Sequence, residues 1–85
     1  MIKVLDFYAE WCQPCQMLMP VLEEFCDTHE NLTLEKINVD QDAASAAKYK
    51  VRSLPTLVFE KEGEEVYRTF GAKTKEELET ILKSI

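Results

Sequence analysis

Residues 4–15 read VLDFYAEWCQPC, and they predict a buried strand that runs through a cysteine-bearing turn into a helix. From Ile2 to Tyr8 the chain is apolar at both alternating sets of positions, apart from one lysine and one aspartate. That pattern is typical of a central strand in a parallel sheet, which is covered on both faces. Pro14 suits the first turn of a helix, where its missing N–H is not needed. We therefore expect the cysteine pair at the junction of strand and helix.

Helix and strand patterns alternate downstream of the cysteines. Pro20 lies inside the first helical pattern and should kink the helix, because it cannot donate to the carbonyl of Gln16. Residues 32–39 predict a second strand, and Asp40 or Asp42 can cap an alanine-rich helix that follows as far as about residue 49. The first helix should bury one continuous apolar stripe of Cys15, Leu18, Met19, Leu22, Phe25 and Cys26.

The C-terminal part of the chain predicts a hairpin followed by a helix. Residues 56–59 and 64–70 read as two strands, and Lys61-Glu62-Gly63 forms the turn between them. Thr74 and Glu77 have the spacing of a capping box, which marks the start of the last helix. The apolar stripe of that helix is Leu78, Ile81, Leu82 and Ile85.

This order of elements predicts an α/β fold, βαβαββα, in one domain over residues 1–85. A strand–helix–strand crossover makes the first two strands parallel neighbours, and the hairpin adds antiparallel strands. The expected result is a four-stranded mixed sheet in the spatial order 2-1-3-4, with helices on both faces.

Composition and charge exclude several function classes. The 46% hydrophobic and 31% charged content of this 85-residue chain is ordinary for a globular domain. Ten Lys and Arg residues are scattered among sixteen acids, for a net charge of −6, which disfavours nucleic acid and anionic membranes as partners. No apolar run approaches the roughly 20 residues needed to cross a bilayer. Because Met1 leads directly into a strand pattern, we expect no signal peptide and a cytoplasmic location. We also expect a monomer.

The chain has three cysteines, and this odd number argues against a domain that is stabilised by several structural disulfides. The pair Cys12 and Cys15 fits either redox chemistry or half of a zinc site. Zinc needs four ligands, and the remaining candidates are Cys26, which should face the core, and His29 at the far end of the helix. Redox chemistry is favoured on this ligand count, and we expect no metal and no bound cofactor.

The two cysteines of the pair should differ in role. A helix N-terminus carries partial positive charge and unpaired amides, which favour a thiolate at Cys12. Because Pro14 has no N–H, the amide and thiol of Cys15 are the natural donors to the Cys12 sulfur. We therefore expect Cys12 to be the exposed attacking thiolate and Cys15 to resolve the mixed disulfide from one turn further in.

The motifs above resemble the thioredoxin family over nearly the whole chain. Residues 4–15 resemble its active-site strand and loop, and Pro20 falls where that family kinks its active-site helix. The following strand, a cis-proline loop and a glycine beside the active site are matched by residues 36–40, Ser53-Leu54-Pro55-Thr56 and Gly71. The resemblance implies a protein-disulfide reductase whose dithiol is regenerated by a thioredoxin-reductase-type enzyme, flavin- or ferredoxin-linked.

The chain departs from the family pattern at three points. Gln13 and Gln16 stand where the family usually has Gly and Lys, and the usual first strand and helix of the family have no counterpart before Met1. The Gln13 amide could donate to the Cys12 thiolate or could merely crowd docking. The size is that of a glutaredoxin, but glutaredoxins usually have Pro-Tyr between their cysteines.

Asp6 is the one carboxylate within the predicted central strand. Burial would raise its pKa and make it a plausible proton acceptor for Cys15. Lys36, on the adjacent strand, could be its partner, as the resemblance also implies. The alternative is a structural aspartate that reaches solvent near the end of the strand.

The resemblance also implies a docking rim for an extended substrate. A cis Pro55 would place the backbone groups of Ser53 and Leu54 beside the dithiol, where a client segment can pair with them. The rim would consist of Trp11, Gln13, Pro14, Val39, Leu54, Pro55, Gly71 and Ala72.

Besides a glutaredoxin-like enzyme, two other functions remain open on these residues. The first is a disulfide isomerase or oxidant, although such domains usually carry His where this chain has Pro14. The second is a redox-inactive binding module, against which the presence of both cysteines, Asp6 and Pro55 argues.

Overall fold

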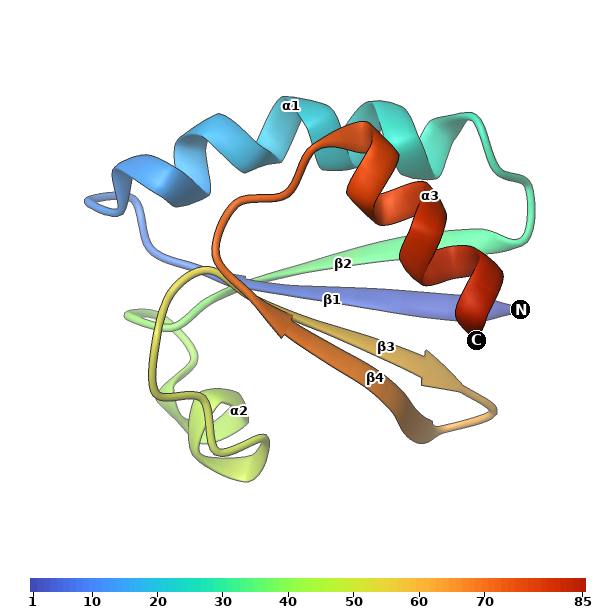
Figure 1. The fold of residues 1–85 in the computed structure, drawn as a ribbon. Helices are drawn as coiled ribbons and strands as arrows, with labels where there is room; N and C mark the ends of the chain where they lie inside the picture. Colours follow the sequence, from blue (N-terminus) through green and yellow to red (C-terminus); the bar gives the residue numbers. More distant parts are fainter.

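The computed structural model describes all residues from Met1 to Ile85, and its elements follow the predicted order (Figure 1). None of its helices combines the length and apolar composition needed to span a bilayer. The elements are β1 (Ile2–Tyr8), α1 (Gln13–Asp27), β2 (Leu32–Asn38), α2 (Ala43–Lys48), β3 (Thr56–Lys61), β4 (Glu64–Phe70) and α3 (Lys75–Ser84).

The sheet has four strands in the order β2-β1-β3-β4, as predicted. Strand β1 pairs in parallel with β2, in a register that sets Asp6 opposite Lys36. On its other side β1 pairs antiparallel with β3, and β3 pairs antiparallel with β4. The apolar character of β1 on both faces follows from this central position.

Helices cover both faces of the sheet, as predicted: α1 and α3 lie on one face and α2 on the other (Figure 1). Because side chains alternate along a strand, β1 contributes to a core on each side. The larger core lies under α1 and α3 and includes Ile2, Val4, Leu18, Leu22, Phe25, Leu57, Phe59, Leu78 and Ile81. The smaller core, on the α2 side, consists of Leu5, Phe7, Ile37 and Val58.

Helix ends confirm the predicted caps. Asp42, rather than Asp40, caps α2, and its side chain accepts from the backbone N–H of Ser45. Thr74 and Glu77 form the complete capping box at the start of α3. Both arrangements satisfy backbone N–H groups that a first helical turn leaves without partners.

Three local details differ from the sequence-based expectation. Strand β3 extends to Lys61, so the hairpin turn is only Glu62-Gly63, with left-handed φ angles of 54° and 82°. Those angles match the twist of paired strands better than an ordinary turn would. Met19 is half-buried rather than a core residue, and Val39 lies just beyond the end of β2.

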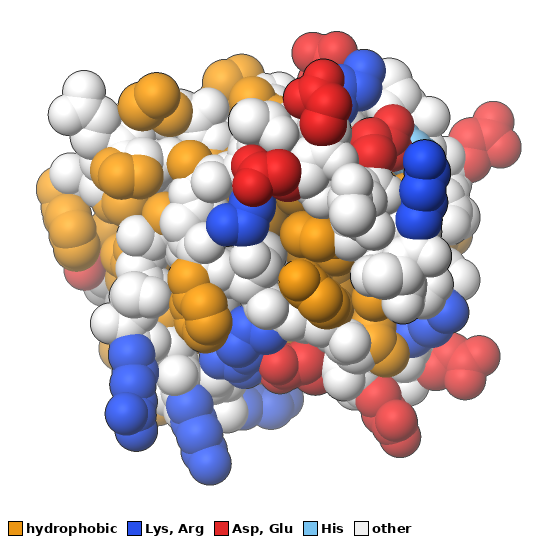
Figure 2. Space-filling view, in the orientation of Figure 1, with side chains coloured by type: hydrophobic (Ala, Val, Ile, Leu, Met, Phe, Trp, Pro, Cys, Tyr) orange, Lys and Arg blue, Asp and Glu red, His pale blue; other side chains and the backbone are white.

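Charged side chains surround the sheet and helices unevenly. Figure 2 shows several Lys and Arg side chains gathered at the lower left, in the region where Figure 1 places α2. Acidic side chains occupy more of the opposite side of that view (Figure 2).

Candidate functional site

Cys12 is the N-cap residue of α1, at the turn that follows β1. Its Sγ accepts a hydrogen bond from the backbone N–H of Cys15 at 3.3 Å, which confirms the expected donor. The two cysteines form a disulfide, with their Cα atoms 5.2 Å apart. The structure therefore holds the oxidised form of a pair placed at a helix N-terminus, where a thiolate is favoured on reduction.

The expectation of an exposed Cys12 is wrong for this oxidised form. Only 5% of Cys12 and 1% of Cys15 is exposed. The pair packs with Ala9 in a small cluster of its own, which Tyr8, Val39 and Leu54 cover in part. Because Cys12 is nearly covered, a client sulfur needs a route to it from the surface.

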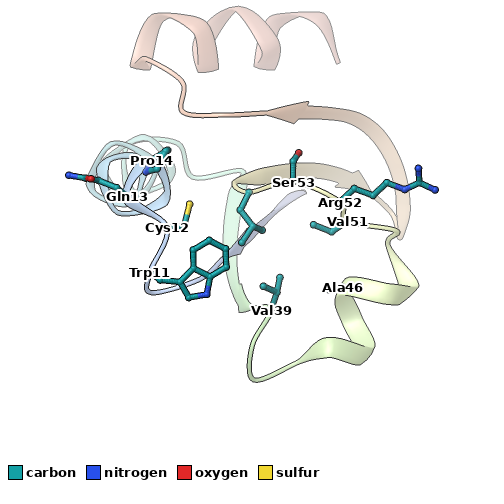
Figure 3. Close-up of a pocket in the computed structure, with 10 residues that line it drawn as sticks. Trp11, Cys12, Gln13, Pro14, Val39, Ala46, Val51, Arg52 and Ser53 are labelled. Carbon is teal, nitrogen blue, oxygen red and sulfur yellow. The ribbon is translucent and has the colours of Figure 1, made fainter.

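That route is a groove of about 570 Å³ beside the disulfide (Figure 3). Trp11 and Cys12 lie on one side of it, and Val51 and Ser53 lie on the other (Figure 3). Of the predicted rim, the groove includes Trp11, Gln13, Pro14, Val39 and Leu54. Ser53, whose backbone is expected beside the dithiol, lines it too, and so do Ala46, Val51 and Arg52, which sequence reasoning missed.

The remaining rim residues lie behind the groove or outside it. The Leu54–Pro55 peptide bond is cis, and Pro55 is buried. Gly71 donates its backbone N–H to the Pro55 carbonyl at 2.9 Å and has a left-handed φ of 83°, which favours glycine. Ala72 lines a different hollow, between α1 and the start of α3. Pro55 and Gly71 thus follow the groove-lining Leu54 without lining the groove, and Ala72 lies outside it.

Trp11 is anchored although 72% of it is exposed. Its indole N–H donates to the Asp40 carboxylate at 2.8 Å. Asp40 is itself held, because its backbone N–H donates to the side-chain oxygen of Asn38 at 2.9 Å. The role of Asp40 was missed in the sequence, where it was only a candidate helix cap.

Asp6 is completely buried, with 0% of its surface exposed. Neither carboxyl oxygen has a hydrogen-bond partner. Burial raises the pKa of Asp6 to about 6, and the positive charge of Lys36 lowers it in part. The alternative of an aspartate that reaches solvent is therefore excluded.

Lys36 acts on Asp6 only at a distance. It lies opposite Asp6 in the strand register, but its Nζ donates to the Glu23 carboxylate on α1. Lys36 is therefore a partner of Asp6 through its charge, which lowers the pKa of Asp6, and not through a hydrogen bond. The part played by Glu23 had no signal in the sequence.

Cys26 is a buried free thiol near the far end of α1. Burial, followed by the negative charges of Asp27 and Asp6, raises its pKa to about 11. His29, the other candidate zinc ligand, instead contacts the Phe25 carbonyl and Glu79. No group of three His, Cys, Asp or Glu side chains is arranged to hold a metal ion.

Comparison with known proteins agrees with the fold and the cysteine pair. A family model described as Thioredoxin matches residues 1–84. The chain belongs to the thioredoxin family. This thioredoxin-family protein is 44% identical over 81 residues to a thioredoxin of Chlamydia pneumoniae, covering 95% of this chain and 79% of that one. It is 40% identical over 83 residues to a thioredoxin of Alicyclobacillus acidocaldarius, covering 96% and 79%.

Solved structures also superimpose on the fold of this thioredoxin-family protein. A mutant thioredoxin from Halobacterium salinarum superimposes with a TM-score of 0.91 at 40% identity, covering 98% of this chain and 73% of that one. A structure described as a malarial protein superimposes with a TM-score of 0.92 at 27% identity, covering 99% and 96%. The Cys12–Cys15 disulfide and the thioredoxin relatives show that the protein is a thiol–disulfide oxidoreductase that reduces protein disulfides.

Proposed function

We propose that this thioredoxin-family protein reduces client disulfides with Cys12 as the nucleophile and Cys15 as the resolving thiol. The observation that carries the proposal is the asymmetry of the pair. Cys12 lines the groove and caps the helix, whereas Cys15 is almost completely buried and does not line the groove. Only the Cys12 sulfur is in a position to meet a client disulfide.

The exchange has two steps. The Cys12 thiolate attacks one client sulfur, so a mixed disulfide forms while the other client sulfur leaves as a thiolate. The Cys15 thiolate then attacks the Cys12 sulfur, and the first client sulfur leaves. The client gains two electrons, and the protein ends as the Cys12–Cys15 disulfide.

Asp6 is proposed to accept the Cys15 proton in the second step. It lies on the α1 side of β1, because strand alternation sets it on the same face as Val4, which packs under that helix. With a pKa of about 6, Asp6 is mostly ionised at neutral pH, and it is a stronger base than an ordinary aspartate. Lys36 is proposed to tune this pKa through its charge, without direct contact.

The groove is proposed to hold an extended client segment. Leu54 and Ser53 line it in the segment that leads into β3, and Leu54 packs against the disulfide cluster. The Ser53 carbonyl already accepts from the Thr56 hydroxyl at 2.6 Å, so the Leu54 backbone and the Ser53 N–H are the groups proposed to form a free edge near the reacting sulfur. Pairing of an extended peptide with such a free edge is a common mode of recognition. Trp11, Gln13 and Pro14 would contact its other side.

The oxidised protein needs an electron donor, and we propose a thioredoxin-reductase-type enzyme, which is the partner that the family implies. We also propose that the protein works as a monomer in the reducing cytoplasm. The free thiol of Cys26 supports that compartment, because a third cysteine is left unpaired.

A trapping experiment tests the assignment of roles. Cys15→Ser keeps the attacking thiolate but removes the resolving thiol, so mixed disulfides with client proteins should accumulate. Cys12→Ser is the matched control and should trap nothing. Equal capture of the same clients by both variants would overturn Cys12 as the nucleophile.

A further inference from the structure

Arg52 is the only charged residue among those that line the client groove. It is exposed, and its guanidinium takes part in none of the hydrogen bonds or salt bridges of the structure. Figure 3 shows it across the groove from Trp11 and Cys12, with its side chain extended away from the disulfide. A free cation therefore stands at one end of an otherwise uncharged groove.

The neighbouring cations are placed differently from Arg52. Three of the ten basic residues lie within residues 48–52, and no acid occurs from residue 43 to residue 59. Lys48 and Lys50, however, line a separate hollow together with Glu60 and Glu65. Acidic side chains face these two lysines, whereas none faces Arg52 within the groove.

Negative charge lies beside the other end of the groove, next to Trp11. The Asp40 carboxylate is fixed against the Trp11 indole at 2.8 Å. Glu10, the residue before Trp11, is exposed at the same turn. A client segment that extends past Trp11 would thus approach acids there, and it would meet a cation at the opposite end of the groove.

We propose that Arg52 is a specificity residue that selects client segments with acidic side chains on one flank of the reactive cysteine. This inference rests on the proposed groove-binding function and deepens it. The cation at one end would also favour one direction of the segment, because the opposite orientation would bring its acids towards Asp40 and Glu10 beside Trp11. Such charges act mainly on the rate of productive encounter.

The test uses short peptides whose single cysteine is capped as a mixed disulfide with neutral 2-thiopyridine. Two flanking positions, on either the N-terminal or the C-terminal side, carry Glu, Gln or Lys. Reduced protein is mixed with each peptide, and release of the coloured thiopyridone gives a second-order rate constant. Each constant is divided by that for dithiothreitol with the same peptide, which removes differences in intrinsic disulfide reactivity.

The wild-type protein should react about two- to fivefold faster with the Glu peptide than with the Gln peptide, for one flank only, as expected for an exposed ion pair. Arg52→Gln should abolish that preference, and Arg52→Glu should reverse it in favour of the Lys peptide. Lys48→Gln is the matched control, because it removes the same charge from the same segment outside the groove, and the preference should persist. At 1 M salt the wild-type preference should shrink towards onefold.

Equal wild-type rates for the Glu, Gln and Lys peptides would overturn the inference while leaving the reductase function intact. An equal loss of preference in Lys48→Gln and Arg52→Gln would also overturn it, since net charge alone would then explain the effect. A wild-type protein that releases no thiopyridone from any peptide would instead contradict the proposed function itself.

Discussion

The Trp11 indole N–H donates to the Asp40 carboxylate at 2.8 Å, and so the residue before the reactive cysteine is tied to the loop after β2. Without this bond an exposed tryptophan would sample several rotamers over the mouth of the groove. Asp40 therefore shapes the entrance without touching either cysteine.

Replacing Asp40 with alanine should release Trp11. The time-resolved fluorescence anisotropy of the single tryptophan should show faster local motion, and client reduction should slow severalfold. Because the bond is exposed, the free energy of unfolding should fall by no more than about 1 kcal/mol. Asp40→Asn keeps an acceptor oxygen, so its tryptophan motion and its rate of client reduction should lie between those of the wild type and the alanine variant. Unchanged anisotropy in the alanine variant would mean that the bond does not restrain the indole.

Alkylation of the reduced protein should occur first at Cys12. The thiolate at the helix N-terminus faces the groove, while Cys15 lies inward of it. Cys26 should be the slowest, because it is buried and its pKa is raised to about 11. Mass-mapped labelling with iodoacetamide near neutral pH gives the order. Equal labelling of Cys12 and Cys15 would contradict their separate roles.

Asp6→Asn should stabilise the oxidised protein at neutral and alkaline pH. The pKa of Asp6 is raised in the folded state from 3.8 to about 6, so the native state binds more protons than the unfolded state between these values. Stability is therefore lost as pH rises through this window, by about 3 kcal/mol at most. The asparagine variant does not lose this stability. Its free energy of unfolding should therefore exceed that of the wild type by almost nothing at pH 4 and by the largest amount above pH 7. Urea unfolding of both proteins across this range measures the difference, and a pH-independent gap would contradict it.

The same Asp6→Asn substitution should slow the reduction of protein disulfides, because Cys15 loses its proton acceptor. Mixed-disulfide formation by Cys12 should proceed at nearly the wild-type rate, so the defect should lie in the resolving step. Stopped-flow measurement of both steps between pH 6 and 9 separates them. Unchanged resolution rates across that range would leave Asp6 with a structural role.

Gln13→Gly tests the clearest departure from the family pattern. In the oxidised structure the Gln13 side chain makes no hydrogen bond, and it points away from the Cys12 sulfur (Figure 3). We expect the reduction potential to fall by no more than a few tens of millivolts, since about 30 mV corresponds to roughly 1.4 kcal/mol for this couple. A glutathione redox titration measures it. A higher potential in the glycine variant would refute donation to the thiolate, and an unchanged potential with altered client rates would favour crowding.

The order of elements, the sheet order and the redox pair were predictable from the sequence because their signals are local. Helical stripes, capping residues and turn residues act over a few positions, and the right-handed crossover leaves few ways to arrange four such strands. The apolar pattern of β1 on both faces, broken only by Lys3 and Asp6, predicts that it is the central strand. Asp6 could be singled out for the same reason, as the carboxylate within that pattern.

Only the tertiary structure decided which side chains meet around the disulfide. Trp11 binds Asp40 across 29 positions of sequence, and Lys36 binds Glu23 across 13. Neither carboxyl oxygen of the buried Asp6 has a hydrogen-bond partner. Cys12 is covered because Val39 and Leu54 pack against it, and Arg52 reaches the groove from the loop before β3. A pattern within one element fixes which of its faces is buried, but not what another element places there. Those contacts depend on how the helices and loops pack on the finished sheet.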